Sequence, residues 1–250
     1  MSDPAGDVER LLRQRGLLAG DAAAAVTSPA VGHRAWASGY LPDGSPVHAA
    51  SSFYAASIAK QVVATLAAQA VLDGALGVDA PLRSFFPALP GWGATVRLRH
   101  LIHHTSGQPA TARVVAALGL EHEAQLDNDL VLEGLARLGD PDDGPGRRFV
   151  YSNIGYVALA EVVRVVSGLP LADAARRLFD RLAMTSAHLG GAADVVRPDR
   201  APPPQTIGDG GLWISADDLL RWLDGLNTER LGTDLTRLVQ TPGRLDDGTP

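Results

Sequence analysis

An almost wholly apolar segment from Ser57 to about Asp73 most constrains how this chain can fold. Read as a helix, the segment is hydrophobic all round, so we expect it to be buried in the protein and not to lie on the surface. Lys60 is the only charged residue in the segment before Asp73, and it is also the only lysine in the chain. Arginine fills every other basic position, which suggests that position 60 needs an amine that can lose its proton when it is desolvated.

Ser57 and Lys60 lie three residues apart, so a helix places them one turn apart on the same face. A serine at the start of a helix feels the positive end of the helix dipole, and a buried, partly neutral lysine beside it can help to take the hydroxyl proton. The pair therefore indicates an activated serine nucleophile. The alternative is a serine that only caps the helix and a lysine whose ammonium group reaches water.

The bulk composition is that of an ordinary globular protein. Of the 250 residues, 46% are hydrophobic and 20% are charged, which suits one large domain or two small ones. The net charge of −6 and the scattered arginines argue against nucleic acid or an anionic membrane as a partner. The sequence shows neither a signal-peptide pattern nor an apolar run of membrane-spanning length, so we expect a cytoplasmic protein. The absence of cysteine excludes disulfides and cysteine zinc sites.

Periodicity and capping signals predict helices through most of the chain and strands only near its front. Two strands are expected between Ala22 and Val47, with residues 41–44 as the clearest turn signal. The expected helices cover residues 8–18, 57–73, 97–104 with Thr95 as the cap, 130–138, 156–166 with Gly168 as the stop, 171–182, and a stretch from Ser215 to Leu226.

The tripeptide Tyr151-Ser152-Asn153 precedes the helix expected at 156–166, so its side chains should lie at the entrance of that helix. A tyrosine there can act as a general base if a neighbouring ammonium group lowers its pKa, and an asparagine can donate a hydrogen bond to a substrate carbonyl. The alternative is that Tyr151 only packs and that Ser152 or Asn153 only caps the helix. Taken by itself, the tripeptide favours this alternative.

Other patterns in the sequence are weaker evidence of function. His100, His103 and His104 have the helical spacing of a metal site, but zinc-protease spacing and a calcium loop are both missing from the sequence. Residues 208–211 are glycine-rich without the lysine or the spacing of a phosphate-binding loop. The sequence has no G-x-S-x-G elbow, which argues against an α/β-hydrolase.

Five segments, in order along the chain, carry a resemblance to a known family. They are residues 53–60 with the serine and the lysine, residues 72–79, residues 99–107 reading R-H-L-I-H-H-T-S-G, the Tyr151-Ser152-Asn153 tripeptide after Pro145-Gly146, and residues 210–219 reading G-G-L-W-I-S-A-D-D-L. Together they resemble the serine β-lactamase and penicillin-binding-protein superfamily, in its class C-like serine hydrolase or esterase branch. The resemblance implies an α+β fold of the β-lactamase/transpeptidase type. We expect a single domain over residues 1–250, with a helical subdomain at about 57–226 beside an antiparallel sheet.

The resemblance also implies the site. Ser57 is the nucleophile that accepts the acyl group, Lys60 takes its proton, and Tyr151 is the partner base that also protonates the leaving group. Asn153 holds the carbonyl oxygen of the substrate, and the histidine of residues 99–107 is structural. A nucleophile at a helix start exposes its own amide, so the N–H of Ser57 should be one donor of the oxyanion hole. We expect a small ester or amide substrate and neither a metal nor an organic cofactor.

The chain departs from the family in the third motif, K-T-G or H-x-G, on a strand that follows the G-G-L segment and supplies the second oxyanion donor. We find no such strand after residues 210–219 and interpret His188-Leu189-Gly190, which precedes them, as a chance match. We therefore expect a C-terminally incomplete chain, either a fragment or a degenerate member, with an incomplete sheet and with poor folding and activity by itself. The rival functions are a non-catalytic pseudoenzyme or binding module of the same fold, and a metal-dependent hydrolase that uses the cluster around His100. The sequence fixes neither the substrate nor the oligomeric state.

Overall fold

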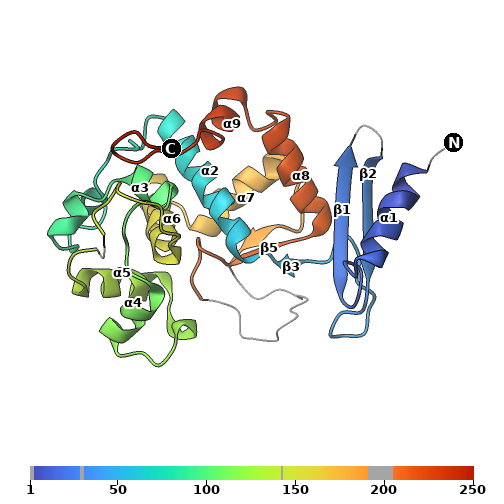
Figure 1. Ribbon diagram of the computed structural model, residues 1–250, viewed down its shortest axis with the longest axis horizontal. Coiled ribbons are helices and arrows are strands. Elements are labelled where there is room, and N and C mark those ends of the chain that lie inside the picture. The colour runs from blue at the N-terminus through green and yellow to red at the C-terminus, as the bar shows by residue number, and fades with distance from the viewer. Residues whose placement is uncertain (1–2, 29–30, 142, 191–204) are drawn as a thin grey trace.

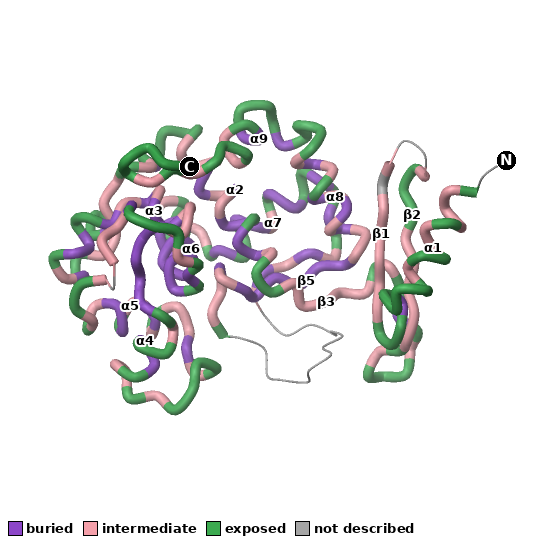
Figure 2. The backbone as a smooth tube through the Cα atoms, viewed as in Figure 1, coloured by how far each residue is buried: buried purple, intermediate pink, exposed green. Residues whose placement is uncertain are grey.

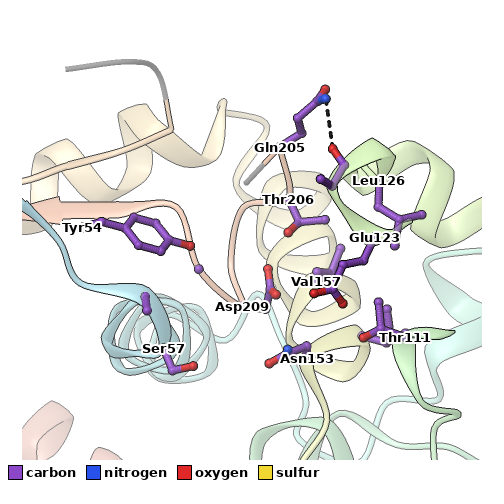
Figure 3. A pocket seen from close by; sticks show the side chains of 14 residues that line it. Tyr54, Ser57, Thr111, Glu123, Leu126, Asn153, Val157, Gln205, Thr206 and Asp209 are labelled. Atoms are coloured by element: carbon purple, nitrogen blue, oxygen red, sulfur yellow. Dashed lines mark hydrogen bonds between the residues drawn. The ribbon is translucent and has the colours of Figure 1, made fainter. Parts of the chain in front are cut away.

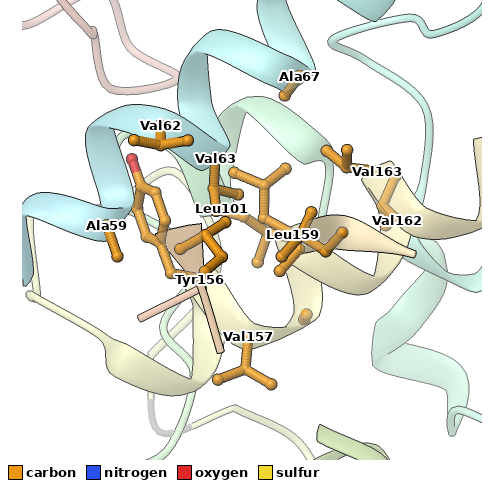
Figure 4. Close-up of a cluster of buried hydrophobic side chains, with 14 of the residues drawn as sticks. Ala59, Val62, Val63, Ala67, Leu101, Tyr156, Val157, Leu159, Val162 and Val163 are labelled. Atoms are coloured by element: carbon orange, nitrogen blue, oxygen red, sulfur yellow. The ribbon is translucent and has the colours of Figure 1, made fainter. Parts of the chain in front are cut away.

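The fold is built around two central helices, α2 (Ala59–Leu72) and α6 (Asn153–Ser167), which pack against each other (Figure 1). The structure is a computed structural model, and it describes residues 3–28, 31–141, 143–190 and 205–250. The burial expected for the apolar segment is confirmed: Val62, Val63 and Ala67 of α2 are at most 1% exposed. Figure 4 shows how these side chains meet those of α6, so the helix that follows Ser57 and contains Lys60 lies in the hydrophobic core of the protein.

The other helices surround this pair. They are α1 (Pro4–Gln14), α3 (Leu98–Ile102), α4 (Thr111–Leu118), α5 (Asn128–Arg137), α7 (Leu171–Arg181), α8 (Ala216–Asn227) and α9 (Thr233–Val239), with 3-10 turns η1 (Ala56–Ile58), η2 (Leu82–Ser84), η3 (Gly91–Ala94) and η4 (Glu123–Gln125). Each helix expected from the sequence is present, with its ends shifted by at most three residues, except that both ends of α1 lie four residues earlier than expected. The sequence reading missed α4 and α9, which are short.

Capping explains the earlier start of α6, and the structure corrects the expected cap of α3. The α6 helix begins at Asn153, earlier than expected, because Ser152 Oγ accepts a hydrogen bond from the N–H of Gly155 at 3.0 Å. It ends, as expected, at Gly168, which has a left-handed φ of 66°. The expected cap of α3 is wrong, since Arg97 is the N-cap residue and Thr95 Oγ1 donates instead to the carbonyl of Trp92 at 2.9 Å.

The front of the chain forms a two-stranded antiparallel sheet, with Ala22 opposite Ser38 and Ser28 opposite Gly32. Its strands are β1 (Ala22–Ser28) and β2 (Gly32–Ser38), both inside the expected range. The turn signal at 41–44 does form a turn, closed by a hydrogen bond from Gly44 N–H to the Leu41 carbonyl at 2.9 Å. It follows β2, however, and does not join the two strands.

A second sheet lies beside the start of α2. It has the order β3-β5-β4, all antiparallel, from β3 (Phe53–Tyr54), β4 (His188–Leu189) and β5 (Leu212–Ile214). The expectation that strands are confined to the front is therefore wrong. These strands have two or three residues each, too few for an alternating pattern to appear in the sequence.

The two ends of the molecule differ in burial. Figure 2 shows the buried residues concentrated around α2, α6 and the second sheet, whereas the front hairpin and α1 are half-buried or exposed. In Figure 1 the hairpin lies at one end, between α8 and α1, and β1 contacts α8. Within the described ranges, no single helix is long and apolar enough to cross a membrane; α6 and α7 pass that test only together, and they are bent by 83° at their junction.

Candidate active site

Ser57 lies where the chain passes from β3 into α2. Ala55 is fixed to the second sheet by a hydrogen bond from its N–H to the Leu212 carbonyl at 2.8 Å. Ala56 then takes a left-handed φ of 44°, a conformation that costs a residue with a Cβ about 1 kcal/mol or more. This turn presents Ser57 as an exposed residue in η1, where backbone N–H groups have no partner within the helix. The serine caps neither η1 nor α2, so the alternative of a purely capping serine is wrong.

The ammonium group of Lys60 is buried against three oxygen atoms. Nζ donates to Ser57 Oγ at 3.2 Å, to Asn153 Oδ1 at 3.0 Å and to the carbonyl oxygen of Asp209 at 2.6 Å. The three N–H groups of an ammonium ion are thus all used. The residue is only 6% exposed, so the alternative in which Lys60 reaches water is wrong.

Tyr151 completes the group around Ser57. Its hydroxyl donates to Ser57 Oγ at 2.7 Å, and Lys60 Nζ lies 4.9 Å from the centre of its ring. Burial acts to raise the pKa of Tyr151, but its interactions with Lys60 and Ser57 outweigh burial and lower the pKa below the ordinary value of 10.0. A lowered pKa brings the phenol closer to the range in which it can accept a proton.

His104 holds the backbone on both sides of Tyr151. Its carbonyl accepts from Val150 N–H at 2.7 Å, and its Nδ1 accepts from Ser152 N–H at 3.1 Å. Its ring packs on the ring of Tyr151 with the centres 4.5 Å apart. Burial first, and then the positive charges of Lys60 and His103, lower the pKa of His104 to about 4, so the imidazole is neutral at pH 7. These contacts support the structural role expected for the histidine of residues 99–107.

Asn153 stands at the first position of α6. Because its Oδ1 accepts the hydrogen bond from Lys60, its Nδ2 is left as a donor, and the residue lines the cavity next to Ser57. The structure thus brings all four residues expected from the sequence, Ser57, Lys60, Tyr151 and Asn153, into one hydrogen-bonded group.

A cavity of about 340 Å³ opens beside Ser57 and extends between α6 and the segment at 205–210 (Figure 3). Its described walls come from five parts of the chain, and the lining residues include Tyr54, Ser57, Thr111, Glu123, Leu126, Asn153, Val157, Gln205, Thr206 and Asp209. Sequence reasoning missed Asp209 as a site residue, because it treated residues 208–211 only as a weak phosphate-binding pattern. Its position directly before the G-G-L segment is the signal that could have found it.

A second cavity, of about 280 Å³, is lined by Tyr151 and shares Thr111 and Asn153 with the first cavity. Gln108 lines it and is only 5% exposed, yet neither of its side-chain amide atoms has a hydrogen-bond partner within the described part of the chain. Buried polar atoms usually have partners, so this glutamine stands out. It was also missed from the sequence, where it simply follows the T-S-G letters.

His100, His103 and His104 do not form a common metal site in the described structure. The α3 helix ends at Ile102, and His100 accepts from Arg97 N–H through Nδ1 while its Nε2 lies 3.1 Å from Asp246 Oδ1. Across the ranges that the structure describes, no three histidine, aspartate or glutamate side chains form a group that could hold a metal ion. His188, of the H-x-G match, lies in β4 with its ring stacked on Trp213 and its Nδ1 3.1 Å from the Ser186 carbonyl.

Comparison with known proteins places this geometry in a family. The family model described as Beta-lactamase matches residues 8–249. Penicillin-binding protein 4* of Bacillus subtilis is 30% identical over 145 residues, covering 56% of this chain and 31% of that protein. The chain spans only 31% and 28% of the length of the two curated relatives that it matches.

Solved structures share the fold. A class C beta lactamase from Rhodobacter sphaeroides is 27% identical with a TM-score of 0.69, covering 95% of this chain and 69% of the other. A D-amino acid amidase from Ochrobactrum anthropi SV3 has a TM-score of 0.74 at 22% identity, covering 93% of this chain and 73% of the other. The architecture is the β-lactamase/transpeptidase type expected from the sequence, and this chain belongs to the beta-lactamase family.

Proposed function

We propose that this chain is a serine hydrolase that forms an acyl-enzyme at Ser57 on an ester or amide substrate. One observation carries the proposal: Ser57 Oγ receives hydrogen bonds from both Tyr151 at 2.7 Å and Lys60 at 3.2 Å. A hydroxyl placed between two groups that can exchange protons is the arrangement that nucleophilic catalysis requires. The amidase and the β-lactamase among the similar structures support the choice of ester or amide.

In the proposed reaction, Ser57 Oγ attacks the carbonyl carbon while its proton passes to the Tyr151 and Lys60 pair. The Ser57 N–H stabilises the resulting oxyanion, as a backbone donor aimed at developing charge does. The bond to the leaving group then breaks, and the leaving group takes the proton from Tyr151. Water attacks the acyl-enzyme, gives its proton to the same pair, and Ser57 regains a proton as the acid departs. The two bases act as a unit, so their apparent pKa values belong to the pair.

Asn153 has a positioning role in this scheme. Its Oδ1 holds Lys60, and its Nδ2 is free to donate to a carbonyl oxygen of the substrate from the wall of the cavity.

The rival function, a non-catalytic module of the same fold, would keep the cavity but would not acylate Ser57. The cytoplasmic location expected from the sequence also belongs to this proposal, and fractionation of the host cell with an antibody to the protein tests it.

A fluorophosphonate separates the enzyme from the non-catalytic module. We expect intact-mass analysis to show one adduct per protein molecule, peptide mapping to place it on Ser57, and Ser57→Ala to abolish it. Ser84→Ala is the matched control, since this exposed serine also lies in a short 3-10 turn, and it should label normally. Absence of any adduct, or an adduct on a different serine, would reject the proposed nucleophile.

A further inference from the structure

Asp209 places a carboxylate in the cavity that contains the nucleophile. Figure 3 shows its side chain between Thr206 and Asn153, in the part of the cavity between Ser57 and α6. The backbone carbonyl of Asp209 accepts from Lys60 Nζ at 2.6 Å, but its side chain does not share this contact. Asp209 Oδ1 is buried and has no hydrogen-bond partner among the residues that the structure describes. The lysine therefore fixes the residue without satisfying its carboxylate.

The surrounding segment leaves Asp209 little freedom to move away. Gly208 has a φ of 117° and packs so closely on α6 that an added Cβ would lie 2.4 Å from Ala160 Cβ. On the other side, a Cβ at Gly210 would lie 2.4 Å from the Tyr54 hydroxyl. Since both neighbours of Asp209 are confined, the backbone of Asp209 is held at this place in the wall of the cavity.

Asn128 anchors the same segment from α5. Its Oδ1 accepts from the Ile207 N–H at 2.8 Å, and its Nδ2 donates to the Ile207 carbonyl at 3.0 Å and to Glu161 Oε1 at 2.7 Å. Glu161 is itself buried in α6 and is paired with Arg164. The position of Asp209 therefore follows from a buried polar network and does not depend on a loose loop.

The acidic and basic side chains that the structure describes in the wall of the cavity are all of one kind. Among the described lining residues, only Glu123 and Asp209 are acidic and none is basic, while the Lys60 ammonium group beside the cavity already donates to three oxygen atoms. A carboxylate oxygen that is removed from water without a donor is costly, so such a group persists where something else compensates for it. A positive group bound in the cavity would supply that compensation, because a charge-assisted hydrogen bond to a carboxylate is among the stronger polar contacts.

We propose that Asp209 selects substrates that carry an ammonium group, which it binds in the cavity beside Ser57, with Glu123 as a weaker second contact. The inference rests on the proposed serine hydrolase function and names its substrate class: amine-bearing esters or amides. Asp209 is a binding residue in this scheme, and it takes no part in proton transfer at Ser57.

Two probes of equal shape test the binding step without turnover. NMR titration of the wild-type chain should show that 4-methylbenzylammonium binds about tenfold or more tightly than 4-methylbenzyl alcohol, the scale of a hydrogen bond to a charged group. Asp209→Asn keeps the shape and the backbone carbonyl and should bring the two affinities close together. Glu123→Gln should reduce the difference only in part. The control Asp173→Asn, at an exposed position in α7, should preserve it.

The corresponding esters extend the test to catalysis. The ratio of kcat/KM for p-nitrophenyl 4-(aminomethyl)benzoate over p-nitrophenyl 4-ethylbenzoate should exceed about ten in the wild type and fall towards one in Asp209→Asn. Equal binding of the two probes by the wild type, or an unchanged ratio in Asp209→Asn, would overturn the inference. If Asp209→Asn does not fold, the wild-type comparison of the two probes still decides. Labelling of Ser57 with equal probe binding rejects only the amine preference, whereas selective probe binding without labelling rejects only the hydrolase.

Discussion

The central helices and the front hairpin are held in place by different forces. In α6, every residue from Ile154 to Val163 is buried, and the helix packs along α2. In the hairpin, the described residues of β1 and β2 are half-buried or exposed, and α1 has no buried residue. The hairpin is tied to its neighbours by single polar contacts, such as Trp36 Nε1 to Glu9 Oε2 at 3.1 Å and His33 Nε2 to Asp217 Oδ1 at 3.2 Å.

This difference indicates which part of the molecule fixes the positions of the side chains in the site. The Ser57 group is assembled from η1, α2, Tyr151 with the adjoining start of α6, and the segment at 205–210. All these parts belong to the central unit, which consists of α2, α6, the second sheet and the segments packed on them, and none belongs to the hairpin or α1. A two-stranded sheet alone is marginally stable, so the hairpin cannot provide a rigid frame of that kind. We therefore expect changes in the central unit to affect chemistry or stability strongly, and matched changes in the hairpin and α1 to have small effects.

The largest expected effect is that of Lys60→Arg. Charge is kept, but guanidinium cannot act as a base, and its planar fork does not fit the space in which one Nζ meets Ser57, Asn153 and Asp209. Stopped-flow measurement should show that a fluorophosphonate, which forms a phosphonate ester with Ser57 and releases fluoride, reacts about a thousandfold more slowly, within the usual range for loss of a general base. Arg34→Lys in β2 is the reciprocal control and should leave the rate unchanged. A near-normal rate of labelling in Lys60→Arg would show that only the charge is needed.

The effects of mutations on the free energy of unfolding should likewise be large in the central helices and small in α1 and the hairpin. Leu159 in α6 is fully buried, and Leu159→Ala should lower the free energy of unfolding by about 3 kcal/mol through lost transfer energy and a new cavity. Leu11 in α1 is 51% exposed, and Leu11→Ala should change it by only about 0.5 kcal/mol or less. Urea unfolding of both variants measures the difference. Comparable losses at the two positions would mean that α1 and the hairpin contribute to stability as much as the central helices do.

Much of the central unit could be predicted from the sequence, because its signals are local. The apolar run after Ser57, the serine caps and Gly168 each act within a few residues, so they indicate α2, α6 and α8 correctly. The spacing of Ser57 and Lys60 and the place of Tyr151 before a helix likewise follow from short-range pattern. The recognition of these segments as one site required the family resemblance, since residues about a hundred positions apart meet only in the fold.

The remainder depends on long-range contacts that no local pattern records. The strands β4 and β5 are stabilised mainly by pairing with each other and with β3, and their two or three residues carry no periodic signal. Asp209 and Gln108 lie in loops, and only the folded chain shows that one enters the cavity and that the other is buried without a partner. The expectation of a C-terminally incomplete chain also stays a prediction.

The pH dependence of the acylation rate should report the loss of the proton from Tyr151. Its proton must be absent for it to act as a base, so the rate should rise with pH and level off above its pKa, which lies below 10.0 because interactions with Lys60 and Ser57 outweigh burial. Tyr151→Phe should slow acylation about a hundredfold and remove this rise. Tyr40→Phe, at an exposed tyrosine after the hairpin, should keep both the rate and the profile. If Tyr151→Phe retains the rise, the titrating group is Lys60 or another residue.

The smallest expected effect concerns Gln108, the one residue of the central region whose described side chain is buried with its whole amide group unpaired. Burial of an amide without hydrogen bonds costs free energy, and an apolar side chain of similar length avoids that cost. Gln108→Met should therefore raise the free energy of unfolding by about 1 kcal/mol, measured by urea unfolding. Gln14→Met, at the exposed end of α1, should have almost no effect. A loss of stability in Gln108→Met would show that the amide of Gln108 has hydrogen-bond partners in solution, for example water in the cavity of about 280 Å³ that it lines. The central unit would then be as fully hydrogen-bonded at Gln108 as it is at Lys60.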